Sequence, residues 1–169
     1  MIDGARYRHV LGHYPTGVCI VTAREKNGLP VGMVVGSFTS VSLQPPLVAI
    51  LASIRSTTWP RLEAAGRFCI NVLASDQLSL CRQFAISGDR KFAGVSHRLS
   101  SHGSPILDGV LAWIQCDLHA VHEAGDHVIA LGYVAELEVQ KQSSPLLFFR
   151  GGYGTFVNQE ETGPIRQVL

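Results

Sequence analysis

The residues in this chain most able to do chemistry include Asp126 and His127, which follow Gly125 at the start of a long apolar run. An imidazole beside a carboxylate can be held in one tautomer and used for proton transfer or hydrogen bonding. Gly-Asp is also a common hairpin turn, in which His127 would simply be exposed. The pair alone leaves both interpretations open.

A second chemical segment, residues 53–58, reads Ser-Ile-Arg-Ser-Thr-Thr between an expected strand and an expected helix. It places four hydroxyls and one guanidinium beside a helix start, whose unpaired N–H groups and positive dipole end suit a phosphate. The alternative is plain capping of that helix by Thr57 or Thr58. Capping needs one hydroxyl, so the additional hydroxyls favour an anion site.

A third segment, residues 32–46, contains Gly32 and Gly36 in a strand-like stretch and stops at Pro45 and Pro46. Glycine inside a strand marks a bulge or a close approach to the main chain. Small residues here would let a flat ring lie against the backbone and take hydrogen bonds from its N–H groups. The alternative is a twisted, tightly packed strand followed by a proline-terminated loop.

The sequence contains no G-x-S-x-G nucleophile elbow, no G-x-G-x-x-G turn and no G-x-x-x-x-G-K-[ST] phosphate loop. Any dinucleotide is therefore not held in the Rossmann manner. His119 and His122 are three apart in an expected strand, so their side chains would point to opposite faces. We expect no metal site.

The elements that must position these residues are mostly strands. A first helix is expected after a cap at Asp3, with Tyr7, Val10, Leu11 and Tyr14 at helical spacing and Pro15 as its end. The absence of a regular strand–helix alternation disfavours a parallel sheet and favours a mainly β (α+β) fold, an antiparallel barrel with a few flanking helices. The expected strands are 17–23, 30–38, 41–43, 47–52, 68–73, 112–121, 127–139 and 146–149, and the other expected helices are 59–65 and 75–85.

The amino-acid composition argues against one class of function and indicates self-association. The 169 residues carry 14 Lys plus Arg and 13 Asp plus Glu, a net charge of +1, which argues against nucleic-acid binding. Charged residues make up 16% of the chain, against a typical value of about 25%. With a mean hydropathy of +0.20, part of the apolar surface is expected to be covered by a second copy, giving a homodimer.

The compartment and domain organisation follow from length and cysteine usage. The longest apolar stretch, residues 45–54, is far short of the ~20 residues of a membrane span, and no signal-peptide pattern opens the chain. The cysteines Cys19, Cys69, Cys81 and Cys116 are scattered and suit buried free thiols in a reducing cytoplasm. We expect one domain, residues 1–157, followed by a polar tail, residues 158–169.

Several short motifs occur in an order that resembles a known family from end to end. The chain is similar to the flavin reductases built on the FMN-binding split barrel, the small reductase components of two-component flavin-dependent monooxygenases. The motifs are Tyr-Pro-Thr-Gly-Val at 14–18, Ser-Phe-Thr-Ser-Val-Ser-Leu at 37–43 with the prolines at 45–46, Gly-Arg-Phe at 66–68, Asn-Val-Leu at 71–73, Phe-Ala at 84–85, Lys-Phe-Ala-Gly-Val at 91–95, Gly-Ser-Pro-Ile-Leu at 103–107, Gly-Asp-His at 125–127 and Phe-Arg-Gly-Gly-Tyr at 149–153.

The resemblance implies a flavin site and a nicotinamide site. Residues along the flavin ring would be Met33, Val34, Val35, Gly36 and Ser37; those at the ribityl phosphate Ser53, Ile54, Ser56 and Thr57; and those closing the far side Phe84, Ala85, Lys91 and Phe92. The nicotinamide dinucleotide would meet His127, Arg150, Gly151, Gly152 and Tyr153. His127 is the candidate catalytic residue, with a binding role ranked above an acid–base role.

The implied activity is that of an NAD(P)H:flavin oxidoreductase. Hydride would pass from nicotinamide C4 to N5 of FMN or FAD, and the reduced flavin would go to a separate monooxygenase. Relatives commonly carry threonine at Val34 and serine at Gly36, so backbone N–H groups would have to replace two side-chain hydrogen bonds. The alternatives are a split-barrel oxidase of the pyridoxamine-phosphate type, and a flavin- or haem-holding barrel that acts as an electron carrier or sensor without being an enzyme.

Overall fold

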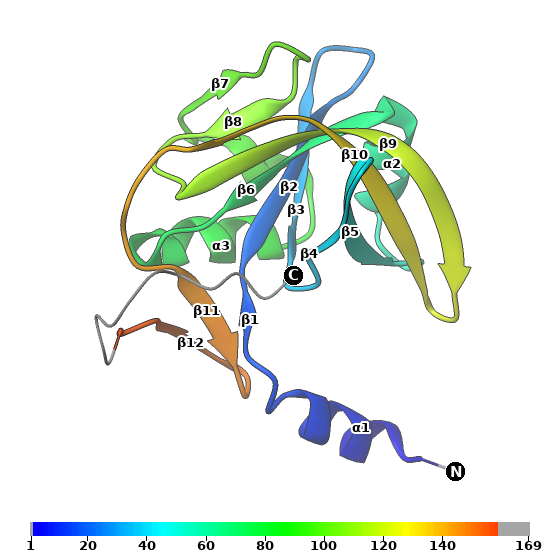
Figure 1. Cartoon of the computed structure of the whole chain (residues 1–169), viewed down its shortest axis with the longest axis vertical. Coiled ribbons are helices and arrows are strands. Elements are labelled where there is room, and N and C mark those ends of the chain that lie inside the picture. The colour runs from blue at the N-terminus through cyan, green and yellow to red at the C-terminus, as the bar shows by residue number, and fades with distance from the viewer. Residues whose placement is uncertain (1, 159–169) are drawn as a thin grey trace.

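The molecule is built around one antiparallel sheet of seven strands, and the expected mainly β architecture is confirmed. The structure, a computed structural model, describes residues 2–158. The strands follow the spatial order β3-β2-β6-β9-β10-β5-β4, and in Figure 1 the long strands β9 and β10 curve across the molecule and down its right-hand side. The seven are β2 (Cys19–Arg24), β3 (Pro30–Val35), β4 (Thr39–Leu43), β5 (Pro46–Ser53), β6 (Arg67–Val72), β9 (Ala112–Ala124) and β10 (His127–Val139).

Ser37, two residues after β3, joins the two ends of this sheet. Its hydroxyl donates to the carbonyl of Leu51 in β5 and accepts the N–H of the same residue, both at 3.0 Å. In the part of the chain that the structure describes, β3 has one strand neighbour, β2. The barrel is therefore split along the outer edge of β3.

Two smaller sheets and several helices surround the barrel. Helix α2 has the bounds that the sequence predicts, and Gly66 ends it with a φ of 71°. The expected helix 75–85 is divided into a 3-10 turn and α3. These elements are α1 (Gly4–Leu11), α2 (Trp59–Ala65), α3 (Leu78–Ala85), the 3-10 turns η1 (Ser75–Gln77) and η2 (Asp89–Phe92), and the strands β1 (Thr16–Gly17), β7 (His97–Leu99), β8 (Pro105–Leu107), β11 (Leu146–Phe149) and β12 (Gly152–Thr155).

The segment after β11 differs from the expected glycine-rich loop. Arg150 and Gly151 have φ values of 49° and 79°, which is the backbone of a tight two-residue turn. Gly152 then pairs with Phe149, and β12 runs back along β11. A strand forms from this glycine-rich sequence because its pairing partner lies only a turn away.

Helix α1 begins as predicted but buries nothing. Both carboxylate oxygens of Asp3 accept backbone N–H groups of the first turn, at 3.3 and 3.2 Å. The helix ends at Leu11, before Tyr14, and no residue in it is buried. Figure 1 shows it projecting from the barrel. The helical spacing of its apolar residues defined a face, but the fold of one chain does not cover that face.

The core lies on both sides of β2. Val21 faces the barrel interior with Phe68, whereas Ile20 packs outside the barrel with Phe84 of α3. A strand buried on both faces has a continuous apolar sequence, which is why residues 19–23 show no alternation. Trp59 of α2 joins the interior cluster. The positions of α2 and α3 are thus fixed by the two cores.

All four cysteines are free and buried, as expected. Burial raises the pKa of Cys19, Cys69 and Cys116 to about 12. Within residues 2–158 no helix is long and apolar enough to cross a membrane. The proposed polar tail falls outside the described residues after Asn158.

The close approach predicted at Gly32 is made by the protein itself. A Cβ atom on Gly32 would lie 2.7 Å from Cε1 of Phe84 and 3.2 Å from the carbonyl oxygen of Val21. The ring that lies against the main chain here therefore belongs to α3, not to a ligand. Glycine at this position is what lets α3 pack on β3.

Gly32→Ala is expected to lower the free energy of unfolding by about 1–3 kcal/mol, the usual cost of overpacking, as measured by urea denaturation. Gly17→Ala is the matched control, because a Cβ atom there meets nothing within 4 Å. Equal stability of the two variants would contradict the packing role given to Gly32.

Candidate functional site

Three hollows meet at the outer edge of β3, and Val34 lines all of them. The His127 hollow, about 700 Å³, lies on one side. The Arg55 hollow, about 350 Å³, lies towards α2 and α3. The Tyr153 hollow, about 250 Å³, lies towards β1, β11 and β12. A single flat ligand over Val34 could therefore reach all three.

The His127 hollow gathers most of the residues expected along a flavin ring. Its wall includes the whole run at positions 33–37, together with Ser53 and His127. Leu51 and Asp126 also line it, and α1 supplies a further wall. The lining residues are Tyr7, Arg8, Met33, Val34, Val35, Gly36, Ser37, Leu51, Ser53, Asp126 and His127.

The backbone of β3 is available on its open edge. The Lys91 ammonium donates to the carbonyl oxygen of Gly32 at 3.2 Å, so this carbonyl points away from β2. Backbone groups two residues apart along a strand point to the same side. The N–H and C=O of Val34 therefore face the open edge as well, where a planar ligand could bond to them.

The Arg55 hollow contains Ser56 and Thr57 of the four residues expected at the phosphate, whereas Ser53 lines the His127 hollow. The helix start in the Arg55 hollow also offers fewer donors than predicted. Ser56, not Thr57 or Thr58, caps α2: its Oγ accepts the N–H groups of Thr58 and Trp59 at 3.2 and 3.1 Å. Pro60 follows and has no N–H. The prediction that the N–H groups at the start of α2 bind a phosphate is therefore wrong for Thr58 and Trp59, because their N–H groups already donate to Ser56.

Side chains remain as the phosphate donors. Arg55, Thr57 and Lys91 all line the Arg55 hollow. The Lys91 ammonium lies 3.4 Å from the Thr58 hydroxyl, and burial, followed by repulsion from Arg61, lowers its pKa below the usual lysine value. Two cations and a hydroxyl can bind a dianion without the helix dipole.

Arg61 fixes the segment that carries Lys91. Its guanidinium donates to both carboxylate oxygens of Glu25, at 2.9 and 2.7 Å, and to Asp89 of η2 at 2.9 Å. The charge and hydrogen bonds of Arg61 lower the pKa of Glu25. The Arg61 guanidinium thus connects α2 to η2 and to the β2–β3 turn.

Two of the expected flavin residues, Phe92 and Ile54, line none of the three hollows. Phe92 packs edge-on against Phe84, with ring centroids 4.9 Å apart, and lines none of the three hollows. The side chain of Ile54 lines none of them either, although its N–H donates to the carbonyl of Asp126 at 3.1 Å. Phe84 and Ala85 line the Arg55 hollow as expected. Ile54 thus joins the phosphate segment to the histidine turn.

The carboxylate–imidazole pair is formed. His127 Nδ1 lies 2.6 Å from Asp126 Oδ1, and this hydrogen bond lowers the pKa of the carboxyl. An ionised carboxylate accepts only, so Nδ1 carries the proton of the bond. Nε2 is then left to face a ligand in the His127 hollow.

The residues expected to bind the nicotinamide dinucleotide lie in two separate hairpins. His127 is in the hairpin between β9 and β10, whereas residues 150–153 are in the β11–β12 hairpin, and Figure 1 shows the two hairpins pointing down on opposite sides of the barrel. Tyr153 lines the Tyr153 hollow, which shares Val34 and Gly36 with the His127 hollow. Arg150, Gly151 and Gly152 line none of the hollows, and the Arg150 N–H donates to the Gly12 carbonyl at 3.0 Å.

Sequence reasoning missed several lining residues. Leu51 and Phe148 carry no chemical signal, and Thr16 was quoted only as part of a motif. Tyr7 and Arg8 were assigned to a helix with no link to the site. Within residues 2–158, no cluster of three or more His, Cys, Asp or Glu residues could hold a metal.

Comparison with known proteins gives a consistent result. The family model described as a flavin reductase like domain matches residues 11–156. A flavin reductase of Pseudomonas putida is 59% identical over 92% of this chain and 91% of its own length. HsaB, the reductase subunit of a flavin-dependent monooxygenase in Rhodococcus jostii, is 45% identical over 96% of this chain and 83% of its own length. The structure of the NADH:FAD oxidoreductase SgcE6 from Streptomyces globisporus, in complex with NAD and FAD fragments, is similar with a TM-score of 0.88 and 35% identity, covering 94% of this chain and 96% of that one.

Ser56→Ala is expected to lower the free energy of unfolding by about 1 kcal/mol, because α2 loses its cap. Thr57→Ala is the matched control and should leave stability within about 0.5 kcal/mol of the unchanged protein. Both are measured by urea denaturation. A larger loss for Thr57→Ala than for Ser56→Ala would mean that the cap is assigned to the wrong hydroxyl.

Proposed function

This chain belongs to the flavin reductase family, and we propose that it binds its flavin along the open edge of β3, with the ring over Val34 and the phosphate in the Arg55 hollow. The protein is an NAD(P)H:flavin oxidoreductase that reduces FMN or FAD. The observation that carries the placement is the meeting of three hollows at one residue, Val34.

The residues present fit a flavin. The isoalloxazine ring is flat and largely apolar with a polar edge, and the β3 edge offers Met33 and Val34 side chains beside the exposed backbone groups of Val34. The ribityl phosphate is a dianion, and Arg55 and Lys91 supply two cations at one end. Hydrogen bonds from cations to phosphate are among the strongest that a protein makes.

Backbone groups support the ring where side-chain hydroxyls are absent. Val34 offers no polar side chain but keeps its outward-facing N–H and C=O. At position 36, the space for a side chain is bordered by the hydroxyl of Thr16, whose Oγ1 lies 3.0 Å from where a Cβ would be. Thr16 thus leaves a hydroxyl beside the ring even though residue 36 is glycine.

When bound, the two ligands would supply the chemistry of the reaction, a hydride transfer from nicotinamide C4 to flavin N5. The protein contributes placement. His127 lines the His127 hollow and is bonded to Asp126 through Nδ1, so Nε2 is the ring nitrogen left to bond a nicotinamide amide or a phosphate. Tyr153 lines only the adjoining hollow, and its hydroxyl lies 3.5 Å from the Cys81 thiol of α3. Residues 150–152 are no longer favoured by the geometry of one chain.

A separate monooxygenase is the recipient of the reduced flavin, as for the relatives that are reductase subunits of such enzymes. Family membership favours this enzyme over an electron carrier or sensor. The dense basic cluster that a pyridoxamine-phosphate type oxidase needs is not found among the residues lining the three hollows. Free, buried thiols support a reducing compartment such as the cytoplasm.

We further propose that the enzyme is a homodimer with residues 1–157 as its single domain. Apolar side chains remain exposed at one end of the sheet: Leu43 of the edge strand β4 and Leu137 of β10. In this sheet β5 joins the two strands. A second copy would cover this surface, and apolar interfaces between subunits are common places for large flat ligands.

Oxidation of NADH, followed by its absorbance, is expected to rise with added FMN or FAD and to saturate. Lys91→Gln should raise the KM for FMN by about 10-fold through loss of a phosphate contact, with little change in kcat. Riboflavin has no phosphate, so with it the variant should match the unchanged enzyme.

Lys26→Gln is the control, because it removes the same charge from the β2–β3 turn outside all three hollows. No flavin-dependent turnover with NADH or NADPH would refute the activity. An equal rise in KM for riboflavin would refute the phosphate placement alone.

Sedimentation velocity at micromolar concentration is expected to show a dimer. Leu137→Glu should shift it to a monomer, since a charge is costly in an apolar interface. Leu29→Glu is the control, because Leu29 is also exposed but lies in the β2–β3 turn. A monomeric unchanged protein, or equal dissociation by both variants, contradicts the proposed interface.

A further inference from the structure

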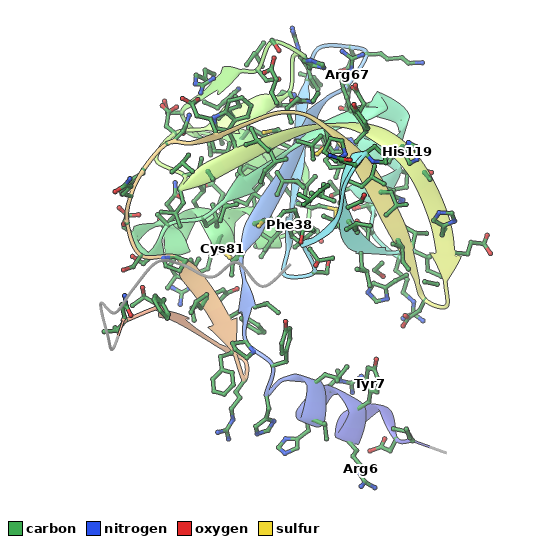
Figure 2. The ribbon with its side chains drawn as sticks, viewed as in Figure 1. Arg6, Tyr7, Phe38, Arg67, Cys81 and His119 are labelled. Carbon is green, nitrogen blue, oxygen red and sulfur yellow. The ribbon has the colours of Figure 1, made fainter. Side chains whose placement is uncertain are left out.

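Helix α1 forms one wall of the His127 hollow although it packs on nothing. Tyr7 and Arg8 line this hollow together with Ser37, Ser53 and His127. Figure 2 shows Tyr7 on the side of α1 that faces the barrel and Arg6 on the opposite side. The helix is thus oriented with one set of side chains towards the site.

An eight-residue helix with no buried side chain is not stable in isolation. Its attachments lie just beyond its C-terminal end, where the Gly12 carbonyl accepts the Arg150 N–H and His13 packs edge-on against Phe149. The part that carries Tyr7 and Arg8 therefore depends on a further contact in the working enzyme. The His127 hollow is where these two residues face.

The charges around this hollow leave one cation unpaired. The Asp126 carboxylate is bonded to His127, and the cations that lower its pKa are His127 and Arg55, not Arg8. The Arg8 guanidinium makes no hydrogen bond or ion pair with any of residues 2–158. An unpaired guanidinium at the rim of a binding hollow is suited to a phosphate, which it can bind with two parallel hydrogen bonds.

We propose that Arg8 binds a phosphate group of the nicotinamide dinucleotide, with α1 as a clamp over the extended half of that ligand. The proposal rests on the proposed function, because it assumes NAD(P)H in the His127 hollow. The flavin phosphate is the less suitable partner. Its cations, Arg55 and Lys91, line the Arg55 hollow, whereas Arg8 lines only the His127 hollow among the three.

The first test is the Kd for NADH on flavin-free protein, measured by NADH fluorescence. Arg8→Met is expected to raise this Kd by about 10-fold, and Arg8→Lys by less, since an ammonium keeps the charge without the planar fork. Arg6→Met is the matched control: it removes the same charge two residues away on the face that points away from the barrel. It should leave the Kd unchanged.

The second test uses 1-benzyl-1,4-dihydronicotinamide, a hydride donor without phosphate. Arg8→Met should reduce this donor's turnover with FMN no more than Arg6→Met does, and the KM for FMN should stay unchanged. An equal increase in Kd for NADH and NADPH would identify the pyrophosphate as the group bound. A larger increase for NADPH than for NADH would identify the 2′-phosphate as a further group bound, and either result supports a phosphate contact.

The outcomes separate this inference from the activity itself. If the unchanged protein shows no flavin-dependent NADH oxidation, the proposed function fails. If that activity is present but Arg8→Met binds NADH as tightly as Arg6→Met, the inference fails alone. Equal loss of turnover with the phosphate-free donor, or dissociation of the dimer by Arg8→Met, would also overturn it, because α1 would then have a structural role.

Discussion

The open edge of β3 is the constraint on which the rest of this structure depends. A strand with one neighbour leaves backbone donors and acceptors unpaired, and such groups must find partners or be solvated. Lys91 satisfies the Gly32 carbonyl, and the Ser37 hydroxyl bridges to Leu51 beyond the end of the strand. Between these two points the backbone of Val34 stays available, and there the three hollows meet.

Packing on both faces of β2, the strand next to β3, then determines which elements surround the open edge of β3. Phe84 fits against Gly32 and brings α3 close to β3. Trp59 anchors α2 in the barrel interior, and Arg61 joins α2 to η2 through Asp89. These apolar and ionic contacts decide where Arg55 and Lys91 lie. The phosphate end of the site is thus built by the core.

The two hollows proposed for the two ligands are lined by different chemical groups. The Arg55 hollow concentrates cations and hydroxyls at one end of the site, whereas the His127 hollow combines a hydrogen-bonded imidazole with a helix that the rest of the chain does not bury. A reductase must bind one ligand while the other enters and leaves. A rigid wall for the flavin and a lightly attached wall for the dinucleotide fit that requirement.

Features that depend on a few neighbouring residues are predictable from the amino-acid sequence. The bounds of α2 and β10, the cap at Asp3 and the stop at Gly66 follow from local backbone chemistry, and the ordered motifs identified the family. Tertiary structure alone decided which groups meet. It filled the space beside Gly32 with Phe84, moved the α2 cap to Ser56, separated Arg150 from His127 and turned Arg8 towards the site. The reason is that side-chain packing and hydrogen bonding act across space, between segments whose separation along the chain carries no local signal.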